Sequence, residues 1–330
     1  LAFLDRMQED NPTPTLGPID ATNPCGEIPL LPYESCNLAS IVLNNHLIKQ
    51  DDNKYTIDWK DLEHTIKTGI RLLDNMIEVN TYALPEIEDM VKNGNRRIGL
   101  GVMGFAHLLF NLGIPYDSDE AVRLAQRLAK FIRRKSEEMS LMLGKERGTF
   151  PNWDISIYAG TAETYRNCAM NMIAPTGTIS MLANCSSGIE PVFSLVTKRK
   201  TFFEDDKNSR PTEELLMIDP VFKNYLSKAK QYDKTTINKI LHQVAEENSL
   251  ENITQLTQKE KAIFTTTHYI SPQWHVKIQS AWQKYFDNSV SKTVNFKNAA
   301  TVDDVKDVYL QAWKLGCKGI TIYRDGSKQD

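Results

Sequence analysis

Residues 23–27, which read Asn-Pro-Cys-Gly-Glu, have the clearest chemical potential in the chain. A carboxamide, a thiol and a carboxylate lie within this run, and a second cysteine, Cys36, follows eleven positions after Cys25. In an extended or looped backbone, side chains alternate with a period of two, so Asn23, Cys25 and Glu27 are expected on one side. One bound molecule could then contact all three.

Glu27 decides which chemistry suits Cys25. A nearby carboxylate raises the pKa of a thiol, so a thiolate nucleophile is disfavoured here. A neutral thiol that carries a hydrogen atom meets no such conflict, because no charge develops on sulfur. The alternative is that Cys25 is a small buried hydrophobe, as most free cysteines are.

A second candidate site follows an apolar run at residues 171–174. Small hydroxyl residues and a glycine at the start of a helix allow backbone N–H groups to meet an anion. The alternative is an ordinary polar turn. The candidate phosphate-binding residues are Pro175, Thr176, Gly177, Thr178, Ile179 and Ser180.

Three glycines, Gly99, Gly101 and Gly104, satisfy the spacing of a dinucleotide-binding motif. They follow a polar run of Asn, Gly and Arg instead of an apolar strand, so the strand, turn and helix context of that motif is poor. We assign these glycines to close packing. A nicotinamide-dependent oxidoreductase is the alternative from a different class of protein.

Helices and short apolar strands alternate along the chain, which predicts an α/β core with parallel strands. Apolar residues recur at spacings of three and four over residues 59–79 and predict a helix with one buried face. A second helix is expected over residues 118–143, with Asp117 as its N-terminal cap and Gly144 as its stop. Residues 202–262 are rich in charged side chains and are expected to form an appended helical surface segment.

The 330 residues carry a formal net charge of −3. That charge gives no basic field for nucleic acid or anionic lipid, so neither is expected as a partner. No apolar stretch in the sequence is long enough for a membrane span, and no signal-peptide pattern is present, which favours a cytoplasmic protein. The five cysteines lack the paired spacing of zinc sites, so no metal ligand is assigned.

Residues 21–41 closely resemble the finger loop of ribonucleotide reductases. Further blocks resemble the same family in the same order and together span almost the whole chain. They cover residues 96–105, 174–180, 184–191, 289–295 and 316–327. The later blocks are most similar to the adenosylcobalamin-dependent, class II enzymes. The resemblance implies an oxidoreductase that converts ribonucleotides to deoxyribonucleotides for DNA synthesis by thiyl-radical chemistry.

The resemblance also implies a role for each residue of the first cluster. Cys25 would carry the radical and remove the 3′ hydrogen of the ribose. Glu27 would be the base on the 3′ hydroxyl, and Asn23 would orient the ribose hydroxyls. Cys36 would be one of two cysteines that supply electrons and close into a disulfide as the 2′ hydroxyl leaves as water. Residues 175–180 resemble the loop that binds the substrate's phosphates.

The family fold is a ten-stranded α/β barrel of two five-stranded parallel halves with a central finger loop. The resemblance implies that this chain supplies the finger loop, about residues 18–40, and the second half of the barrel. The run at Leu1 reads as the end of a helix already under way. We therefore expect a C-terminal half, inactive without its N-terminal half.

The implied ligands and partners are adenosylcobalamin, a ribonucleoside di- or triphosphate, a thioredoxin-like reductant, the N-terminal half, and a second copy in a dimeric complete enzyme. In a class I enzyme, a separate diiron subunit would supply the radical in place of cobalamin. A non-catalytic assembly remnant of the same fold is the remaining alternative. No role is assigned to Cys168, Cys185 and Cys317.

Overall fold

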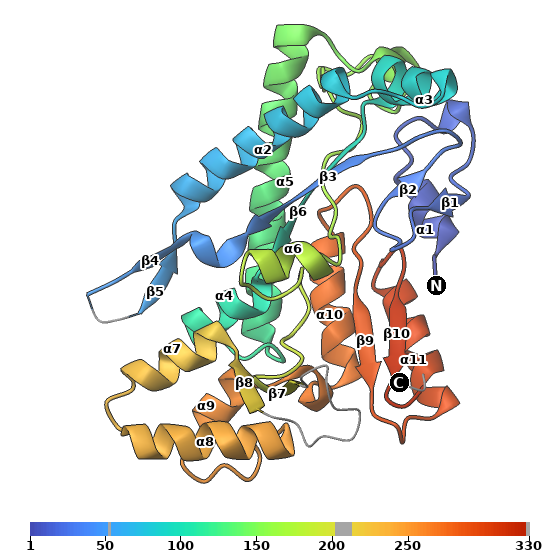
Figure 1. The fold of residues 1–330 in the computed structure, drawn as a ribbon. Coiled ribbons are helices and arrows are strands. Elements are labelled where there is room, and N and C mark those ends of the chain that lie inside the picture. Colours follow the sequence, from blue (N-terminus) through green and yellow to red (C-terminus); the bar gives the residue numbers. More distant parts are fainter. Residues whose placement is uncertain (52–53, 202–212, 328–330) are drawn as a thin grey trace.

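The computed structural model describes residues 1–51, 54–201 and 213–327. Helices surround a central row of strands, and a further group of helices extends from one end of the molecule (Figure 1). Within the described ranges, no helix is both long and apolar enough to cross a membrane.

Two pairs of parallel strands lie at the centre of the molecule (Figure 1). The first pair is β3 (Asn37–Val42) and β6 (Ile98–Met103). The second pair is β9 (Thr293–Phe296) and β10 (Thr321–Arg324). Parallel pairing requires a long crossover between strands, which helices provide here.

An irregular segment at residues 171–173 connects the two pairs. Asn171 forms a parallel bridge to Leu100 of β6, and Ile173 forms one to Val290, just before β9. The order β3, β6, segment 171–173, β9 and β10 is thus a row of parallel strands, as predicted for an α/β core. The expected barrel is not seen as such, because no sheet closes on itself within the described residues.

The first residues of the chain extend this row beyond β10. Ala2 forms an antiparallel bridge to Gly319, and the backbone N–H of Phe3 donates to the carbonyl of Lys318 at 2.9 Å. The helix α1 (Leu4–Glu9) begins only after this pairing. The expectation that the chain opens inside a helix is therefore wrong, because backbone pairing at the strand edge holds these residues extended.

The helix α2 (Trp59–Val79) packs against β3 and β6. The side chain of Asp58 caps it by accepting hydrogen bonds from the first-turn N–H groups. The helix has the predicted bounds and the predicted buried face, which consists of Leu62, Ile66, Ile70, Leu73 and Ile77.

The helix α5 (Asp119–Arg147) packs against α2 but differs from the prediction at both ends. Its cap is Ser118, whose hydroxyl accepts from the N–H of Ala121 at 3.1 Å, and not Asp117. The predicted stop, Gly144, lies inside the helix. A Cβ at that position would lie 1.8 Å from the carbonyl oxygen of Thr164, so this glycine allows close packing of another segment.

The glycines of β6 serve the same purpose. A Cβ on Gly99 would lie 2.6 Å from Cδ2 of Leu38, and a Cβ on Gly101 would lie 2.4 Å from the carbonyl oxygen of Met172. Both glycines lie inside a strand and not in the turn that a dinucleotide motif requires. This geometry supports close packing and leaves the nicotinamide alternative without a phosphate-binding turn.

Gly101→Ala is expected to lower the free energy of unfolding by roughly 2–3 kcal/mol, because the new methyl group meets buried backbone that cannot move freely. Urea denaturation of the chain measures the change. Gly177→Ala is the matched control, since a Cβ there meets nothing within 4 Å. Equal stability of the two variants would contradict the packing role of Gly101.

The group of helices that extends from one end of the molecule has a hydrophobic cluster of its own (Figure 1). α7 (Pro220–Lys228), α8 (Lys234–Glu247) and α9 (Gln258–Ile263) surround buried side chains such as Phe222 and Phe264. These helices fall in the segment predicted to carry surface helices, of which residues 202–212 lie outside the described residues. A hairpin of β7 (Val196–Thr201) and β8 (Glu213–Ile218) precedes them.

The other elements are shorter or lie beside the strand row. α10 (Pro272–Gln283) packs on β9 and on α11 (Val302–Lys314). The remaining elements are the 3₁₀-helices Pro14–Leu16, Leu43–Asn45, Pro151–Ile155 and Thr267–Tyr269, the π-helix Val91–Asn95, the helices α3 (Pro85–Met90), α4 (Phe105–Leu112) and α6 (Gly177–Leu182), and the strands β1 (Ala21–Thr22), β2 (Pro29–Leu30), β4 (Leu47–Lys49) and β5 (Tyr55–Ile57).

Candidate functional site

The antiparallel hairpin of β1 and β2 carries Cys25 at its tip. The N–H of Ile28 donates to Oδ1 of Asn23 at 3.0 Å, and this bond closes the hairpin. Gly26 adopts φ +79°, which glycine tolerates without strain. Residues 24–27 therefore form a turn. Of the two predicted backbone forms, the tip is therefore the looped one and not the extended one.

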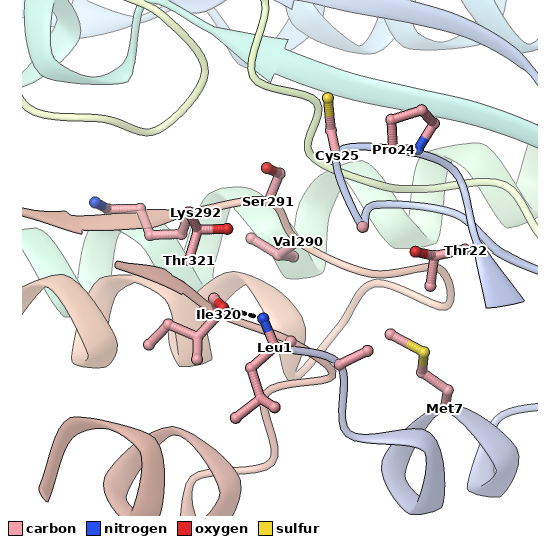
Figure 2. Close-up of a pocket in the computed structure, with 13 residues that line it drawn as sticks. Leu1, Met7, Thr22, Pro24, Cys25, Val290, Ser291, Lys292, Ile320 and Thr321 are labelled. Atoms are coloured by element: carbon pink, nitrogen blue, oxygen red, sulfur yellow. Dashed lines mark hydrogen bonds between the residues drawn. The ribbon is translucent and has the colours of Figure 1, made fainter. Parts of the chain in front are cut away.

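Cys25 is exposed and lines a pocket of about 150 Å³. The chain around β9 and β10 contributes Val290, Ser291, Lys292 and Thr321 to the same pocket (Figure 2). Of the side chains predicted to act together, Cys25 lines this pocket whereas Asn23 and Glu27 are not among its lining residues. The thiol is thus accessible from outside the chain.

The surroundings of Cys25 keep its sulfur protonated. Partial burial raises the pKa of the Cys25 thiol, and the Glu27 carboxylate raises it further. The direction is the one expected from the sequence. A neutral thiol at this position suits hydrogen-atom transfer better than ionic nucleophilic attack.

Glu27 is only 2% exposed, and its carboxylate oxygen Oε2 has no hydrogen-bond partner among the described residues. Its backbone carbonyl accepts from the N–H of Ser289 at 2.8 Å, which ties the hairpin to the chain before β9. The hydroxyl of Ser289 is buried and also lacks a partner in the described part of the chain. Such orphaned polar groups cost free energy unless a ligand or water satisfies them.

Cys36 directly precedes β3, and its Sγ donates to the carbonyl of Asn37 at 3.4 Å. Burial raises the pKa of its thiol well above the usual value, Arg97 lowers it, and Glu34 raises it. All five cysteines of the chain are free. Cys36 therefore forms no disulfide here and lies in a separate, charged environment from Cys25.

The predicted phosphate-binding residues lie at the start of α6. Thr176 adopts φ +55° before the helix, and its hydroxyl accepts from the N–H of Gly188 at 2.7 Å. The hydroxyl of Ser180 contacts that of Ser187 at 2.9 Å. Gly177 has open space around it. The helix start thus offers N–H groups that no intrahelical carbonyl satisfies.

Strand register relates this turn to the Cys25 pocket. Ile173 pairs with Val290, and the N–H of Ser291 donates to the carbonyl of Ile173 at 2.9 Å. Pro175 lies two residues beyond Ile173, a rise of roughly 7 Å along a strand, and is therefore about level with Lys292 of the pocket wall. The pocket and the turn lie at the same end of neighbouring parallel segments.

A buried charged group that sequence reasoning missed joins the same two regions. The ammonium of Lys292, whose side chain is fully buried, pairs with the carboxylate of Glu190 and contacts Nδ1 of His275 at 2.8 Å. Glu190 also accepts from the N–H of Thr293 at 2.7 Å. Lys292 and Glu190 belong to two of the family-like blocks. Because 102 positions separate them, the spacing of residues in the sequence could not predict that they pair.

Residues 1–323 match the sequence model of the family described as ribonucleotide reductase, barrel domain. The chain belongs to this reductase family. Among curated relatives, it is 42% identical to a vitamin B12-dependent ribonucleoside-diphosphate reductase of Thermoplasma acidophilum over 99% of the chain and 40% of the relative. It is also 42% identical to an enzyme of the same name from Mycobacterium tuberculosis, over 100% of the chain and 45% of the relative.

A solved structure shares the fold of this reductase-family chain. It is the class Id ribonucleotide reductase alpha subunit of Actinobacillus ureae, with a TM-score of 0.78 and 24% sequence identity. The match covers 99% of the chain and 58% of that structure. Of the two curated relatives named above, by contrast, the chain spans less than half the length.

Proposed function

We propose that this chain is the finger-loop and second-half-barrel portion of an adenosylcobalamin-dependent ribonucleotide reductase. The observation that carries the proposal is the tip of the hairpin, where an exposed neutral thiol lies two residues from a buried carboxylate with an orphaned oxygen. The first group suits hydrogen-atom transfer, and the second suits a ligand hydroxyl. The family membership and the names of the relatives support the same chemistry.

Each residue then has a defined task. The Cys25 sulfur, as a thiyl radical, takes the 3′ hydrogen of the ribose, and Glu27 accepts the proton of the 3′ hydroxyl. The 2′ hydroxyl leaves as water, while Cys36 and a second cysteine outside this chain are oxidised to a disulfide and supply two electrons. Cys25 finally returns its hydrogen atom to the 3′ carbon. Asn23 stiffens the hairpin through its bond to Ile28 and orients the ribose hydroxyls.

The accessibility of Cys25 fits a radical source that lies outside the chain. Cys25 is exposed and lines the pocket, and within the described part of the chain its sulfur has no hydrogen bond that would have to break. When bound, adenosylcobalamin would supply the radical that oxidises this thiol. A separate diiron subunit is the alternative source, and the names of the relatives favour cobalamin.

The turn at residues 175–180 would hold the phosphates of a ribonucleoside di- or triphosphate. Its open glycine and unsatisfied N–H groups suit an anion, and its position beside the pocket wall suits a ribose at Cys25. The Glu190–Lys292 pair would keep the turn and the wall at a fixed separation.

The missing half of the barrel would cover the open edges of the strand row. At one edge, Ala2 forms an antiparallel bridge to Gly319, and strands of the other half-barrel would run in the same antiparallel direction. At the other edge, β3 pairs with β6 and with no further strand among the described residues. The part of the relatives that this chain does not span would supply the remaining strands and the partner of Cys36, and a dimer and a thioredoxin-like reductant would complete the enzyme.

The test is an assay of the chain assembled with the N-terminal polypeptide of the same enzyme, a ribonucleotide and a dithiol reductant. Deoxyribonucleotide is expected only when adenosylcobalamin is added. Product that requires a diiron subunit would move the enzyme to class I. Absence of product with either radical source would favour a non-catalytic assembly remnant.

A further inference from the structure

A row of reactive and charged side chains lies where three neighbouring parallel segments begin. Asn37 pairs with Ile98, so Cys36 and Arg97 occupy the preceding register position on adjacent strands. Side chains at paired positions share one face of a sheet, and adjacent strands lie roughly 5 Å apart. The carbonyl of Ala169 accepts from the N–H of Ile98, which brings the neighbouring Cys168 to the other side of Arg97.

Arg97 is 2% exposed, and one of its three guanidinium nitrogens has no hydrogen-bond acceptor among the described residues. Its Nε donates to Oε1 of Glu34 at 2.9 Å, and its Nη1 donates to Oδ1 of Asn288 at 2.8 Å. Its Nη2 has no hydrogen-bond partner among the described residues. A buried cationic donor without an acceptor is costly, so its retention points to an anion that forms in another state of the protein.

Glu34 pairs with Arg97 but also holds other donors. Its carboxylate accepts two further hydrogen bonds, from the side chain of Asn95 and from the backbone N–H of Leu31. Burial raises the pKa of the Cys36 thiol, Arg97 lowers it, and Glu34, Cys168 and Asp287 raise it further. The positive charge of Arg97 therefore favours negative charge on this sulfur.

The protonation state of Cys36 decides whether its sulfur has a hydrogen-bond partner. As a thiol, Cys36 donates to the carbonyl of Asn37. As a thiolate, it loses that bond because it has no proton to donate, and it requires a donor instead. The free Nη2 of Arg97 lies on the adjacent strand at the paired position.

We propose that Arg97 stabilises the thiolate of Cys36 when the disulfide of Cys36 is reduced. This inference rests on the proposed redox role of Cys36. In the reduction, a thiolate of an external dithiol attacks the partner sulfur, the disulfide bond breaks, and its electron pair moves to the Cys36 sulfur. The second thiol of the reductant then resolves the mixed disulfide, the reductant is oxidised, and water protonates Cys36. A better-stabilised leaving thiolate departs faster.

The test measures the alkylation rate of Cys36 by iodoacetamide against pH, read by peptide mass spectrometry on the folded chain. Arg97→Met is expected to slow alkylation near neutral pH about tenfold, which corresponds to a rise of one unit in the pKa of Cys36. Arg97→Lys should restore most of the rate, because it keeps the charge. Alkylation of Cys25 on the same samples is the internal control and should not change.

Glu34→Gln gives a second, independent result if Arg97→Met does not fold. It removes the opposing charge and should therefore speed alkylation of Cys36, the opposite of the effect of Arg97→Met. A general loosening of the fold would also change alkylation of Cys25, which should stay constant here. An unchanged pH profile in Arg97→Met, or equal rates in Arg97→Lys and Arg97→Met, would overturn the proposal. Because the assay requires no turnover, failure of the proposed reductase function would leave its result intact.

Discussion

Cys25→Ser is expected to abolish deoxyribonucleotide formation in the assembled enzyme, with a loss on the order of 10⁴ or more, the scale seen when an essential covalent group is removed. A serine hydroxyl holds its hydrogen too tightly to carry a radical between cofactor and ribose. The substitution changes one atom of an exposed residue and breaks no hydrogen bond among the described residues, so the fold should persist. Chromatographic detection of deoxyribonucleotide measures the loss.

Cys185→Ser is the matched control for this experiment. Cys185 is half-buried, lies in a family-like block, and has no assigned role. Its variant should keep the activity of the native chain. Equal turnover of Cys25→Ser and the native chain would defeat the radical assignment.

Glu27→Gln is expected to lower kcat by roughly 10²–10⁴, the usual contribution of a positioned acid or base. The amide has the shape of the carboxylate but cannot take a proton from a ribose hydroxyl. Because Oε2 of Glu27 has no partner within the described chain, the substitution breaks no bond of that oxygen and should cost little stability. Steady-state kinetics and urea denaturation of the same samples separate the two effects.

Asp20→Asn is the control for loss of a carboxylate in the same region. Asp20 is exposed and directly precedes β1. Its variant should retain both activity and stability. A Glu27→Gln variant with native kcat would show that the buried carboxylate is not the base.

Local patterns predicted the elements whose positions depend on local physics. Helix α2 has the expected bounds, because its apolar spacing and its Asp58 cap both lie within the element. Helix α5 runs past Gly144, because this glycine does not end the helix but makes room for the backbone of Thr164. No local pattern reveals a contact with a residue so far along the chain. The parallel strands were expected from the alternation of helices and strands, but the predicted barrel is not seen, because no sheet closes on itself within the described residues.

The residues of the candidate site were predicted from the sequence, but their geometry was not. Cys25, Glu27 and Cys36 were proposed from their types, their spacing and the family resemblance. The hairpin that carries Cys25 was not predicted beyond a loop, because its closure depends on Gly26 and on the hydrogen bond from Ile28.

Long-range pairs were also beyond the reach of spacing. Lys292 meets Glu190 across 102 positions, and Arg97 meets Glu34 and Asn288 across 63 and 191 positions. Lys292, Glu190, Arg97 and Glu34 belong to family-like blocks, and Asn288 directly precedes one. The blocks indicated that these residues matter but not which of them are in contact. Only the register of the strands brings them together.

The most direct measurement of the central claim is the single-turnover rate of the assembled enzyme with ribonucleotide that carries either hydrogen or deuterium at the 3′ carbon. Transfer of that atom to the Cys25 sulfur predicts slower conversion of the deuterated substrate, and no conversion of either by Cys25→Ser. Equal rates for the two substrates, with product still formed by Cys25→Ser, would mean that the hairpin thiol does not exchange a hydrogen atom with the sugar.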